Sequence, residues 1–365
     1  MDGASYETLP PAPFRQDGRA GAIWRLALVN LLLSICTLGF WRFWGKTRVR
    51  RYLWQHTSFL DEPLEYTGTG WELCRSFLIA VLLVVLPLVL LDHFADSLLL
   101  RRDGRGWFLK GAVAAVGLLL VGVGLYSAWR YRLTRTRWRG IRGGQSGSAL
   151  LYGLLWGGWT VLAILTLGLA TPWRNMALMR YRLGHAWFGD RRFSFDGRGR
   201  DLFTTFLYAW ATALVGVALL ALAVRAVVLP FLAGMARGEV PNADPLVVLS
   251  LPAGLLAAGL LLGIAVTRYL ACEWRYVAGR LRFGTVAFAA EFNGRQLAWV
   301  YVPNALLGLF TLGLGRPYAA LRVARFVTGA VTVQGGVDFA AVGQSRHKLA
   351  TAAEGLASSL DLSGI

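Results

Sequence analysis

The stretch TLGFWRFWGKTRVRRYLW, residues 37–54, follows an apolar segment and combines aromatic residues with arginines. Two other stretches align with it without a gap: TLGLATPWRNMALMRYRL at 166–183 and TLGLGRPYAALRVARFVT at 311–328. In each, Thr-Leu-Gly comes first, an aromatic residue stands seven positions after the threonine, and an Arg-aromatic pair stands at fourteen and fifteen. We call this pattern the T-L-G motif. Its recurrence predicts three copies of one structural unit.

Each T-L-G motif places a threonine and a glycine at the end of an apolar segment. These residues are Thr37, Gly39, Thr166, Gly168, Thr311 and Gly313. Because glycine adopts backbone conformations that other residues resist, we expect a turn in the chain at each motif.

A second motif alternates with the first. WRYRLTRTRW at residues 129–138 and WRYVAGRLRF at residues 274–283 match without a gap, and we call this pattern the W-R-Y motif. After the motifs, aromatic and β-branched residues recur two positions apart around short turns, which is typical of β-hairpins. We expect the outer strands of this β-layer near PAPFRQ, residues 11–16, and near Val331.

The composition predicts a polytopic α-helical membrane protein. Of the 365 residues, 56% are hydrophobic and only 16% are charged, whereas soluble domains carry about 25% charged residues. A bilayer core needs about 20 apolar residues per helix. One apolar segment precedes Thr37, and six further uncharged runs occupy residues 76–91, 111–129, 143–173, 202–224, 245–267 and 296–315.

The positive charges follow the motifs. The net charge is +18, and 29 of the 38 Lys and Arg residues lie in the five segments 42–75, 130–142, 174–200, 268–295 and 316–348. The positive-inside rule places these segments and the C-terminus in the cytoplasm. We attribute the excess charge to topology and to attraction for anionic membrane lipids rather than to nucleic acid binding.

Two topologies satisfy these patterns. Each W-R-Y motif follows two long apolar runs, so the chain crosses the membrane twice and returns to the same side. Each T-L-G motif follows one apolar segment, so a full crossing would place the next motif on the opposite side of the membrane. We favour T-L-G segments that enter and leave on the same face, with their irregular backbone buried in protein. The alternative is that all seven segments cross, and the basic loop 101–110 supports it.

The Arg-aromatic pairs are the first candidate site. An arginine at a helix exit extends its head group to the interface while its aromatic neighbour anchors among the lipid head groups. Alternatively, several arginines on one face bind phosphate head groups. The ten residues are Arg51, Tyr52, Arg130, Tyr131, Arg180, Tyr181, Arg275, Tyr276, Arg325 and Phe326.

A second candidate is an ion path. Asp92, His93 and Asp96 follow the first long apolar run, and the spacing of the two aspartates puts them on one helical face. Ionisable groups inside a membrane are commonly functional, although these three also fit the outer interface. Arg225 is a possible partner. His56 and His185 share a position in the first two T-L-G units, where we expect local hydrogen bonds rather than a metal site.

The organisation predicts a flexible tail at 1–13, a membrane domain at 14–345 and a second tail at 346–365. The domain divides into units 14–63, 64–142, 143–192, 193–289 and 290–345. No cleaved signal peptide is expected from the N-terminal sequence, and the three cysteines show no pairing or metal spacing. We find no catalytic constellation and expect no cofactor. The oligomeric state stays open.

The motifs resemble those of a known family. NLLLSICTLGFWRFWGKTRVRRYLW, LEYTGTGWEL and the later FSFDGRG and FNGR are similar to the YjgN-like family of bacterial inner-membrane proteins, over about residues 12 to 345. The resemblance implies a bacterial inner-membrane location and repeated architecture. The family is a domain of unknown function, so it implies no substrate or catalytic residue.

Two functions fit the sequence. Internal repeats often frame transport sites, so our first hypothesis is a small-solute or ion pathway. The alternative is an anionic-lipid-binding or membrane-organising protein without transport or catalysis. A membrane enzyme is third.

Overall fold

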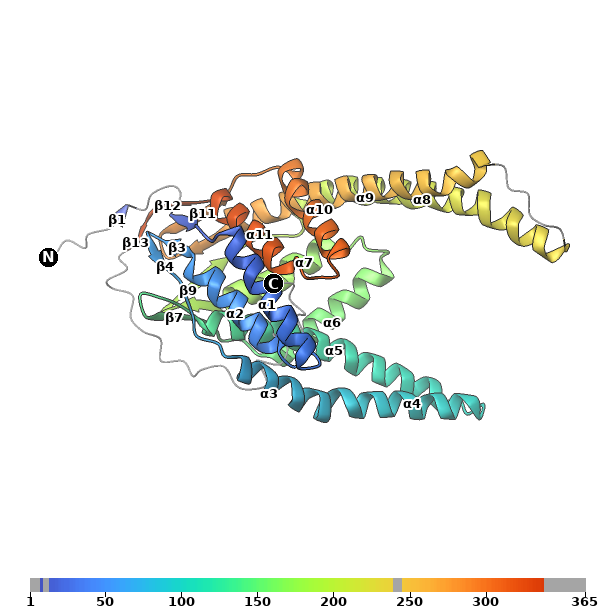
Figure 1. Cartoon of the computed structure of the whole chain (residues 1–365), viewed down its shortest axis with the longest axis horizontal. Coiled ribbons are helices and arrows are strands. Elements are labelled where there is room, and N and C mark those ends of the chain that lie inside the picture. Colours follow the sequence, from blue (N-terminus) through green and yellow to red (C-terminus); the bar gives the residue numbers. More distant parts are fainter. Residues whose placement is uncertain (1–6, 9–12, 239–244, 338–365) are drawn as a thin grey trace.

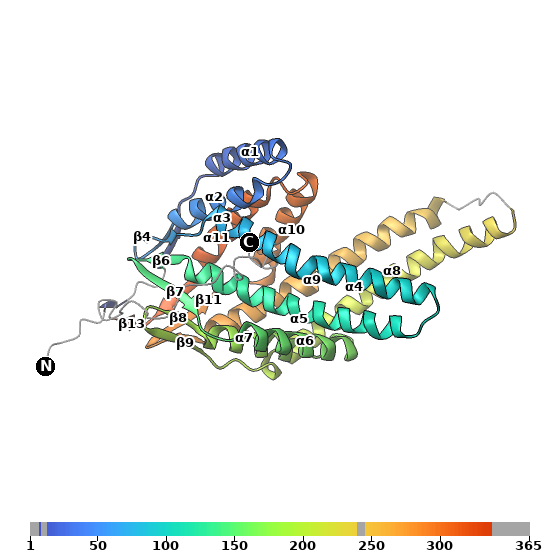
Figure 2. The same ribbon diagram turned by 90° about the horizontal axis from the view of Figure 1, so that it is seen from below.

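The helices form five hairpins, which extend from one layer of β-strands (Figure 1). The computed structural model describes residues 7–8, 13–238 and 245–337. The described strands lie at one end of the molecule, and the helices extend away from them in both views (Figure 2). The chain is thus mostly helical, as expected of a polytopic membrane protein. Most of the two predicted tails, 1–13 and 346–365, lies outside the described residues.

Two long hairpins contain the candidate membrane spans. The first comprises α3 (Gly70–Ala80), the π-helical turn η1 (Val81–Val85), α4 (Leu86–Leu100) and α5 (Arg105–Thr134), and the second comprises α8 (Arg200–Ala236) and α9 (Pro245–Arg280). Four segments of 30 to 37 residues in these hairpins are long and apolar enough to cross a membrane. At about 1.5 Å per residue each exceeds the hydrocarbon core of about 30 Å.

Three short hairpins carry the T-L-G motifs, and we call them the T-L-G hairpins. Each consists of an apolar helix, the T-L-G turn and a more polar helix that contains the Arg-aromatic pair. Their helices are α1 (Ala20–Cys36) with α2 (Arg42–Gln55), α6 (Ala149–Leu165) with α7 (Thr171–Gly184), and α10 (Gly294–Phe310) with α11 (Arg316–Ala330).

The strands are short, and every described pair is antiparallel. An eight-stranded sheet has the order β12-β11-β10-β9-β8-β7-β6-β5, a three-stranded sheet has the order β2-β3-β4, and β1 pairs with β13. Leu64 alone separates β4 from β5, so the two sheets adjoin. The bounds are β1 Glu7–Thr8, β2 Phe14–Gln16, β3 Thr57–Phe59, β4 Glu62–Pro63, β5 Glu65–Tyr66, β6 Thr136–Trp138, β7 Ile141–Gln145, β8 Ala186–Phe188, β9 Arg191–Phe195, β10 Leu281–Phe283, β11 Val286–Ala290, β12 Val331–Gln334 and β13 Gly336–Val337.

Each helical hairpin begins and ends in neighbouring strands. Strand β2 precedes α1 and pairs with β3, which follows α2. The same holds for β5 with β6, β7 with β8, β9 with β10, and β11 with β12. Strands β2 and β12 are edge strands, as the sequence predicts. The hairpin predicted after Val331 differs, because β13 pairs with β1 rather than with β12.

Aromatic side chains form the core of the β-layer. Phe59, Trp138, Phe188 and Phe283 each stand eight residues after a motif arginine, and consecutive ring centroids lie 5.0, 6.1 and 6.3 Å apart. One hydrophobic cluster joins strands from both sheets, so the layer curls around it. The cluster contains Phe283, Val286 and Val333, packed against Phe14, Ile141, Phe188, Phe193 and Phe288.

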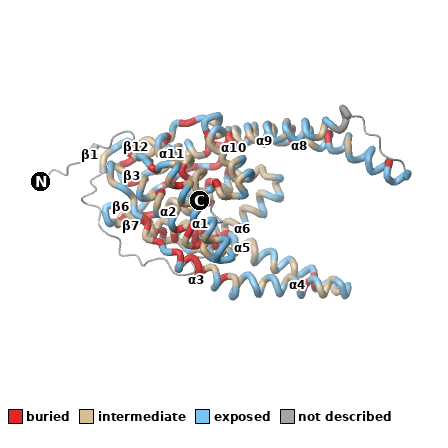
Figure 3. The backbone as a smooth tube through the Cα atoms, viewed as in Figure 1, coloured by how far each residue is buried: buried red, intermediate tan, exposed pale blue. Residues whose placement is uncertain are grey.

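The long hairpins expose their apolar side chains. Buried residues concentrate near the strands, whereas α4, α8 and α9 are mostly exposed or intermediate (Figure 3). Exposed apolar patches on a soluble monomer rarely exceed a few hundred Å². Helices that are apolar around their whole circumference are expected in a lipid environment.

Candidate functional site

Four of the five motif arginines bind the backbone at the start of the next hairpin. The guanidinium of Arg51 donates to the Gly68 carbonyl at 3.4 Å, and that of Arg180 donates to the Gly197 carbonyl at 2.7 Å. The other two contacts are Arg130 to the Gly147 carbonyl and Arg325 to the Gly18 carbonyl. The last contact joins the final hairpin to the first. We call these four residues the arginine ring.

Arg275 differs from the arginine ring. Its counterpart position in the next hairpin is Phe292, and the described part of the chain shows no such carbonyl contact for Arg275. The side chains of Arg51, Arg180, Arg275 and Arg325 remain exposed. Their roles as interface anchors or head-group ligands therefore remain predictions, and they are compatible with the contacts that these arginines make within the protein.

The motif tyrosines bind the start of their own hairpin. The Tyr52 hydroxyl accepts from the Arg19 backbone N–H at 2.7 Å, and the Tyr181 hydroxyl accepts from the Ser148 N–H at 2.9 Å. Phe326 lacks a hydroxyl and packs on Phe292, with ring centroids 5.2 Å apart. The pairs Arg51–Tyr52, Arg130–Tyr131 and Arg180–Tyr181 can thus each connect two adjacent hairpins.

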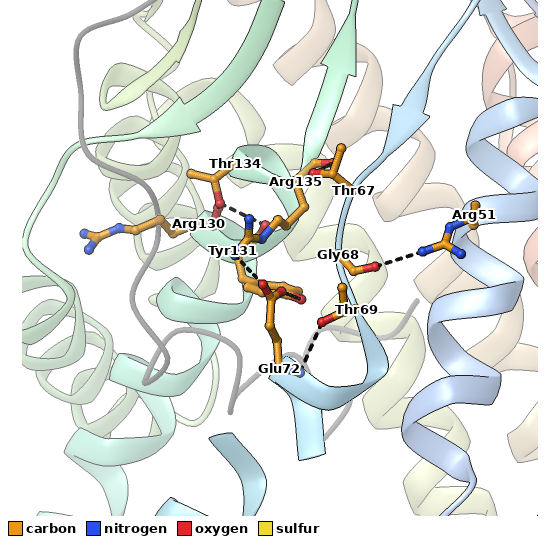
Figure 4. Close-up of polar contacts among 9 residues, drawn as sticks. All are labelled: Arg51, Thr67, Gly68, Thr69, Glu72, Arg130, Tyr131, Thr134 and Arg135. Atoms are coloured by element: carbon orange, nitrogen blue, oxygen red, sulfur yellow. Dashed lines mark hydrogen bonds and ion pairs between the residues drawn. The ribbon is translucent and has the colours of Figure 1, made fainter. Parts of the chain in front are cut away.

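Both W-R-Y motifs build a tyrosine–carboxylate–arginine triad. In the first, Tyr131 donates to Glu72 at 2.8 Å, and Arg135 pairs with the same carboxylate at 2.8 Å (Figure 4). Thr69 caps α3 by accepting from the Glu72 N–H. In the second, Tyr276 donates to Asp201, and Arg280 lies 4.0 Å from that carboxylate.

The T-L-G turns have one backbone conformation. The leucine has φ of 50–51° and the glycine has φ of 89° in all three turns. The threonine hydroxyl donates to a carbonyl four residues earlier and accepts from an N–H four residues later, and the glycine N–H donates to a carbonyl five residues earlier. The carbonyls that accept from the threonines belong to Leu33, Leu162 and Leu307. Those that accept from the glycines belong to Ser34, Ala163 and Gly308. The N–H groups that donate to the threonines belong to Trp41, Ala170 and Gly315.

The leucine of each turn projects from the protein. Leu38, Leu167 and Leu312 are 92%, 78% and 96% exposed. A non-glycine residue in the left-handed region costs about 1–2 kcal/mol, so three such leucines are unexpected in a soluble protein. The turn satisfies much of its own backbone by internal hydrogen bonds. Its tip is exposed rather than buried in protein as the sequence predicts, so the internal hydrogen bonds take the place of the expected protein cover.

The candidate ion-path residues lie in both long hairpins. Lys110 on α5 contacts Asp92 at 3.1 Å and Asp96 at 2.9 Å, so the two aspartates share one face of α4 as expected. Arg225 lies on α8, in the other long hairpin, and those hairpins are well separated in Figure 1. The partner of the aspartates is therefore Lys110 rather than Arg225. No described contact assigns a role to His93.

A hollow of about 270 Å³ lies where α6, α7 and the start of α8 meet, and we call it the α7–α8 hollow. Three arginines and two tryptophans line it with smaller apolar residues. The lining residues are Trp159, Trp173, Met176, Ala177, Arg180, Arg198, Gly199 and Arg200.

Within the described residues, no group of three or more His, Cys, Asp or Glu side chains could hold a metal ion. The Nδ1 atoms of His56 and His185 lie 2.8 and 2.7 Å from the Tyr52 and Tyr181 carbonyls, which are the local hydrogen bonds that the sequence predicts.

Sequence reasoning missed three sets of functional candidates. The glycine carbonyls that accept from the arginine ring carry no side-chain signal. Glu72 and Asp201 were detectable, because each stands four residues after such a glycine. Arg198 and Arg200 were missed because they follow a segment of the second T-L-G unit whose sequence pattern indicates only strands and a turn.

Comparison with known proteins supports an inner-membrane location. A family model described as "Bacterial protein of unknown function (DUF898)" matches residues 11–359. "Inner membrane protein YjgN" of Salmonella typhimurium (strain LT2) is 28% identical over 127 residues, which cover 35% of this chain and 29% of that relative. No solved structure matches the chain. The chain therefore belongs to the DUF898 family of bacterial proteins of unknown function and is a YjgN-like inner-membrane protein.

Proposed function

We propose that this protein organises the inner membrane by binding anionic lipid and embedding three short hairpins in one leaflet. Its five hairpins are tandem related units whose β-layer faces the cytoplasm. The two long hairpins cross the bilayer, and the T-L-G hairpins enter it and return. The whole assembly performs no transport or catalysis in this proposal.

The observation that carries the proposal is the geometry of the T-L-G hairpins. Their flanking strands pair with each other, so each hairpin must leave the bilayer on the side from which it entered. Helix α1 has 17 residues, about 25 Å at 1.5 Å per residue, which is less than the hydrocarbon core of about 30 Å. An exposed leucine tip gains about 1.5–3 kcal/mol when lipid covers it, which offsets its backbone strain.

The charge distribution supports the orientation and the lipid partner. Basic residues concentrate in the segments that connect the hairpins to the β-layer. The positive-inside rule then favours a cytoplasmic β-layer. Anionic lipids of the same leaflet attract such a surface by about 1 kcal/mol per basic residue.

Thiol labelling in whole cells tests this arrangement. In a chain with Cys36, Cys74 and Cys272 replaced, single cysteines at sheet-side positions should resist an impermeant reagent added outside. A cysteine at Arg102, at the tip of the first long hairpin, should react. The sheet-side positions are His56, Arg135, His185 and Gly284, together with Gln344 outside the described residues.

A probe at Leu167 completes the test. A fluorophore there should be quenched by nitroxide lipids but not by an aqueous quencher from either side of a liposome. Labelling of the His185 cysteine from outside would instead indicate that α6 crosses the membrane, and the proposal would then be wrong.

The solute or ion pathway is the second candidate. The ion-paired group Asp92, Asp96 and Lys110 within candidate spans favours it. In liposomes that contain a pH dye, a membrane potential should then drive proton entry that Asp96→Asn abolishes. Equal fluxes in protein-containing and empty liposomes would count against a proton path.

A further inference from the structure

We infer that the α7–α8 hollow binds the phosphodiester group of an anionic phospholipid. This inference rests on the proposed function, since it assigns that lipid to one place. Three arginines line the hollow: Arg180 on α7, Arg198 just before α8 and Arg200 at the start of α8. All three side chains are exposed, so their hydrogen-bond donors can reach a ligand. Arginine forks match phosphate oxygens in geometry and charge.

Close backbone packing brings these arginines together. A Cβ atom at Gly199 would lie 2.6 Å from the Trp173 Cα, so only glycine allows α8 to begin against α7. Arg180 donates to the Gly197 carbonyl at 2.7 Å, which holds the same segment from its other side. Arg198 and Arg200 flank Gly199 and therefore start from a fixed backbone.

The charge in the hollow is incompletely neutralised. The Asp201 carboxylate lies 3.6 Å from Arg200. That carboxylate also accepts from Tyr276 and contacts Arg280. No described carboxylate pairs with Arg180 or Arg198, so the three arginines outweigh one shared aspartate.

The corresponding junction between α2 and α3 lacks this chemistry. Gly70 packs on Trp44 there as Gly199 packs on Trp173, with Cβ distances of 2.8 and 2.6 Å to the tryptophan Cα. Thr69 and Trp71 flank Gly70 where Arg198 and Arg200 flank Gly199. The two extra arginines are therefore particular to the α7–α8 junction and are not needed to build it.

The position of the hollow favours lipid over free phosphate. It lies at the first residue of the span Arg200–Ala236, where an uncharged run begins. Trp159 and Trp173 line it, and tryptophan is enriched at the head-group level of membranes. A phospholipid can place its phosphate among the arginines while its acyl chains follow the apolar helices.

Native mass spectrometry of the full chain in detergent tests the inference. Phosphatidylglycerol, phosphatidylcholine with the same acyl chains, and inorganic phosphate are titrated in parallel. The Arg198→Gln/Arg200→Gln variant should bind phosphatidylglycerol about 30-fold more weakly, the fold-change for two basic residues at about 1 kcal/mol each. The Arg198→Lys/Arg200→Lys variant should lose part of this affinity, because lysine keeps the positive charge but lacks the planar guanidinium group that binds two phosphate oxygens at once.

The matched control is Arg191→Gln/Arg192→Gln on β9, which removes the same charge away from the hollow and should retain binding. Melting temperatures check that every variant folds. Unchanged affinity in the Arg198/Arg200 variant would overturn the inference. If the wild type still preferred phosphatidylglycerol, the proposed function would survive that result. If the wild type bound phosphatidylglycerol and phosphatidylcholine equally, both the inference about the hollow and the proposed function would be wrong. If inorganic phosphate competed with an affinity equal to that of phosphatidylglycerol, the assignment of a lipid to the hollow would be wrong.

Discussion

At the scale of the residue, each of the three residues of the T-L-G motif has its own task. The threonine hydroxyl satisfies a carbonyl before the turn and an N–H after it. The glycine, at φ of 89°, allows the chain to reverse. The leucine extends the apolar surface to the tip of the hairpin. Because water is absent from the bilayer core, a turn placed there must satisfy its backbone internally.

The glycine of the second turn gives the sharpest residue-scale prediction. Gly168→Ala should destabilise the protein by more than about 1 kcal/mol, because alanine resists the positive φ. Gly158→Ala is the matched control: Gly158 lies in helix α6 with open space around it. Alanine should stabilise the control by up to about 1 kcal/mol. A higher melting temperature for Gly168→Ala in detergent would contradict a strained turn.

At the scale of the element, polar triads hold each long hairpin to its own start. Tyr131 and Arg135 at the end of α5 share the Glu72 carboxylate in the first turn of α3. The second triad is looser, since Arg280 lies 4.0 Å from Asp201. Arg135 is also more buried than Arg280, with side-chain exposures of 17% and 47%.

Double-mutant cycles should separate the two triads. Glu72→Gln with Arg135→Gln should show a coupling energy of about 1 kcal/mol in the unfolding free energy. Asp201→Asn with Arg280→Gln should show a smaller coupling energy, because this pair is longer and exposed to solvent. Equal couplings would mean that burial and distance do not control these contacts.

The element order was partly predictable from the sequence. Aligned motifs and hydrophobic runs identified the long hairpins, the β-hairpins and the edge strands, because periodicity and charge are local signals. The pairing of β13 with β1 was not predictable, because it joins residues at opposite ends of the chain. The ion pair of Lys110 with Asp92 and Asp96 was missed for a related reason, since it depends on how α4 and α5 align.

At the scale of the whole molecule, the hairpins form a closed circuit. The arginine ring links all consecutive hairpins except the fourth and fifth, which pack through a buried cluster that includes Ala271 and Leu297. Arg325 connects the last hairpin to Gly18. Strand β2, which precedes the first hairpin, pairs with β3 and also contacts α11 of the last hairpin. Ile23, Leu53 and Leu321 add a buried cluster across the same closure.

Arg325→Ala should therefore destabilise the protein more than Arg275→Ala. The first change removes a charge-assisted hydrogen bond, worth about 1.5 kcal/mol at the lower end of the usual range because Arg325 is exposed. Arg275 occupies the same motif position without a described carbonyl contact. Thermal unfolding and trypsin resistance in detergent provide the measurement. Equal losses would indicate that the closing contact adds nothing to stability.

Closure of the circuit also sets an order of events during synthesis. Strand β2 and Gly18 leave the ribosome first, yet Arg325 and Leu321 are made hundreds of residues later. Until then the first hairpin lacks its α11 neighbour, and Ile23, fully buried in the finished protein, stays uncovered. In a chain that ends before α11, the first hairpin should therefore remain exposed around Ile23, although the missing residues are at the C-terminus. Membrane proteases that recognise exposed apolar surface would then detect such a truncated chain at its first hairpin.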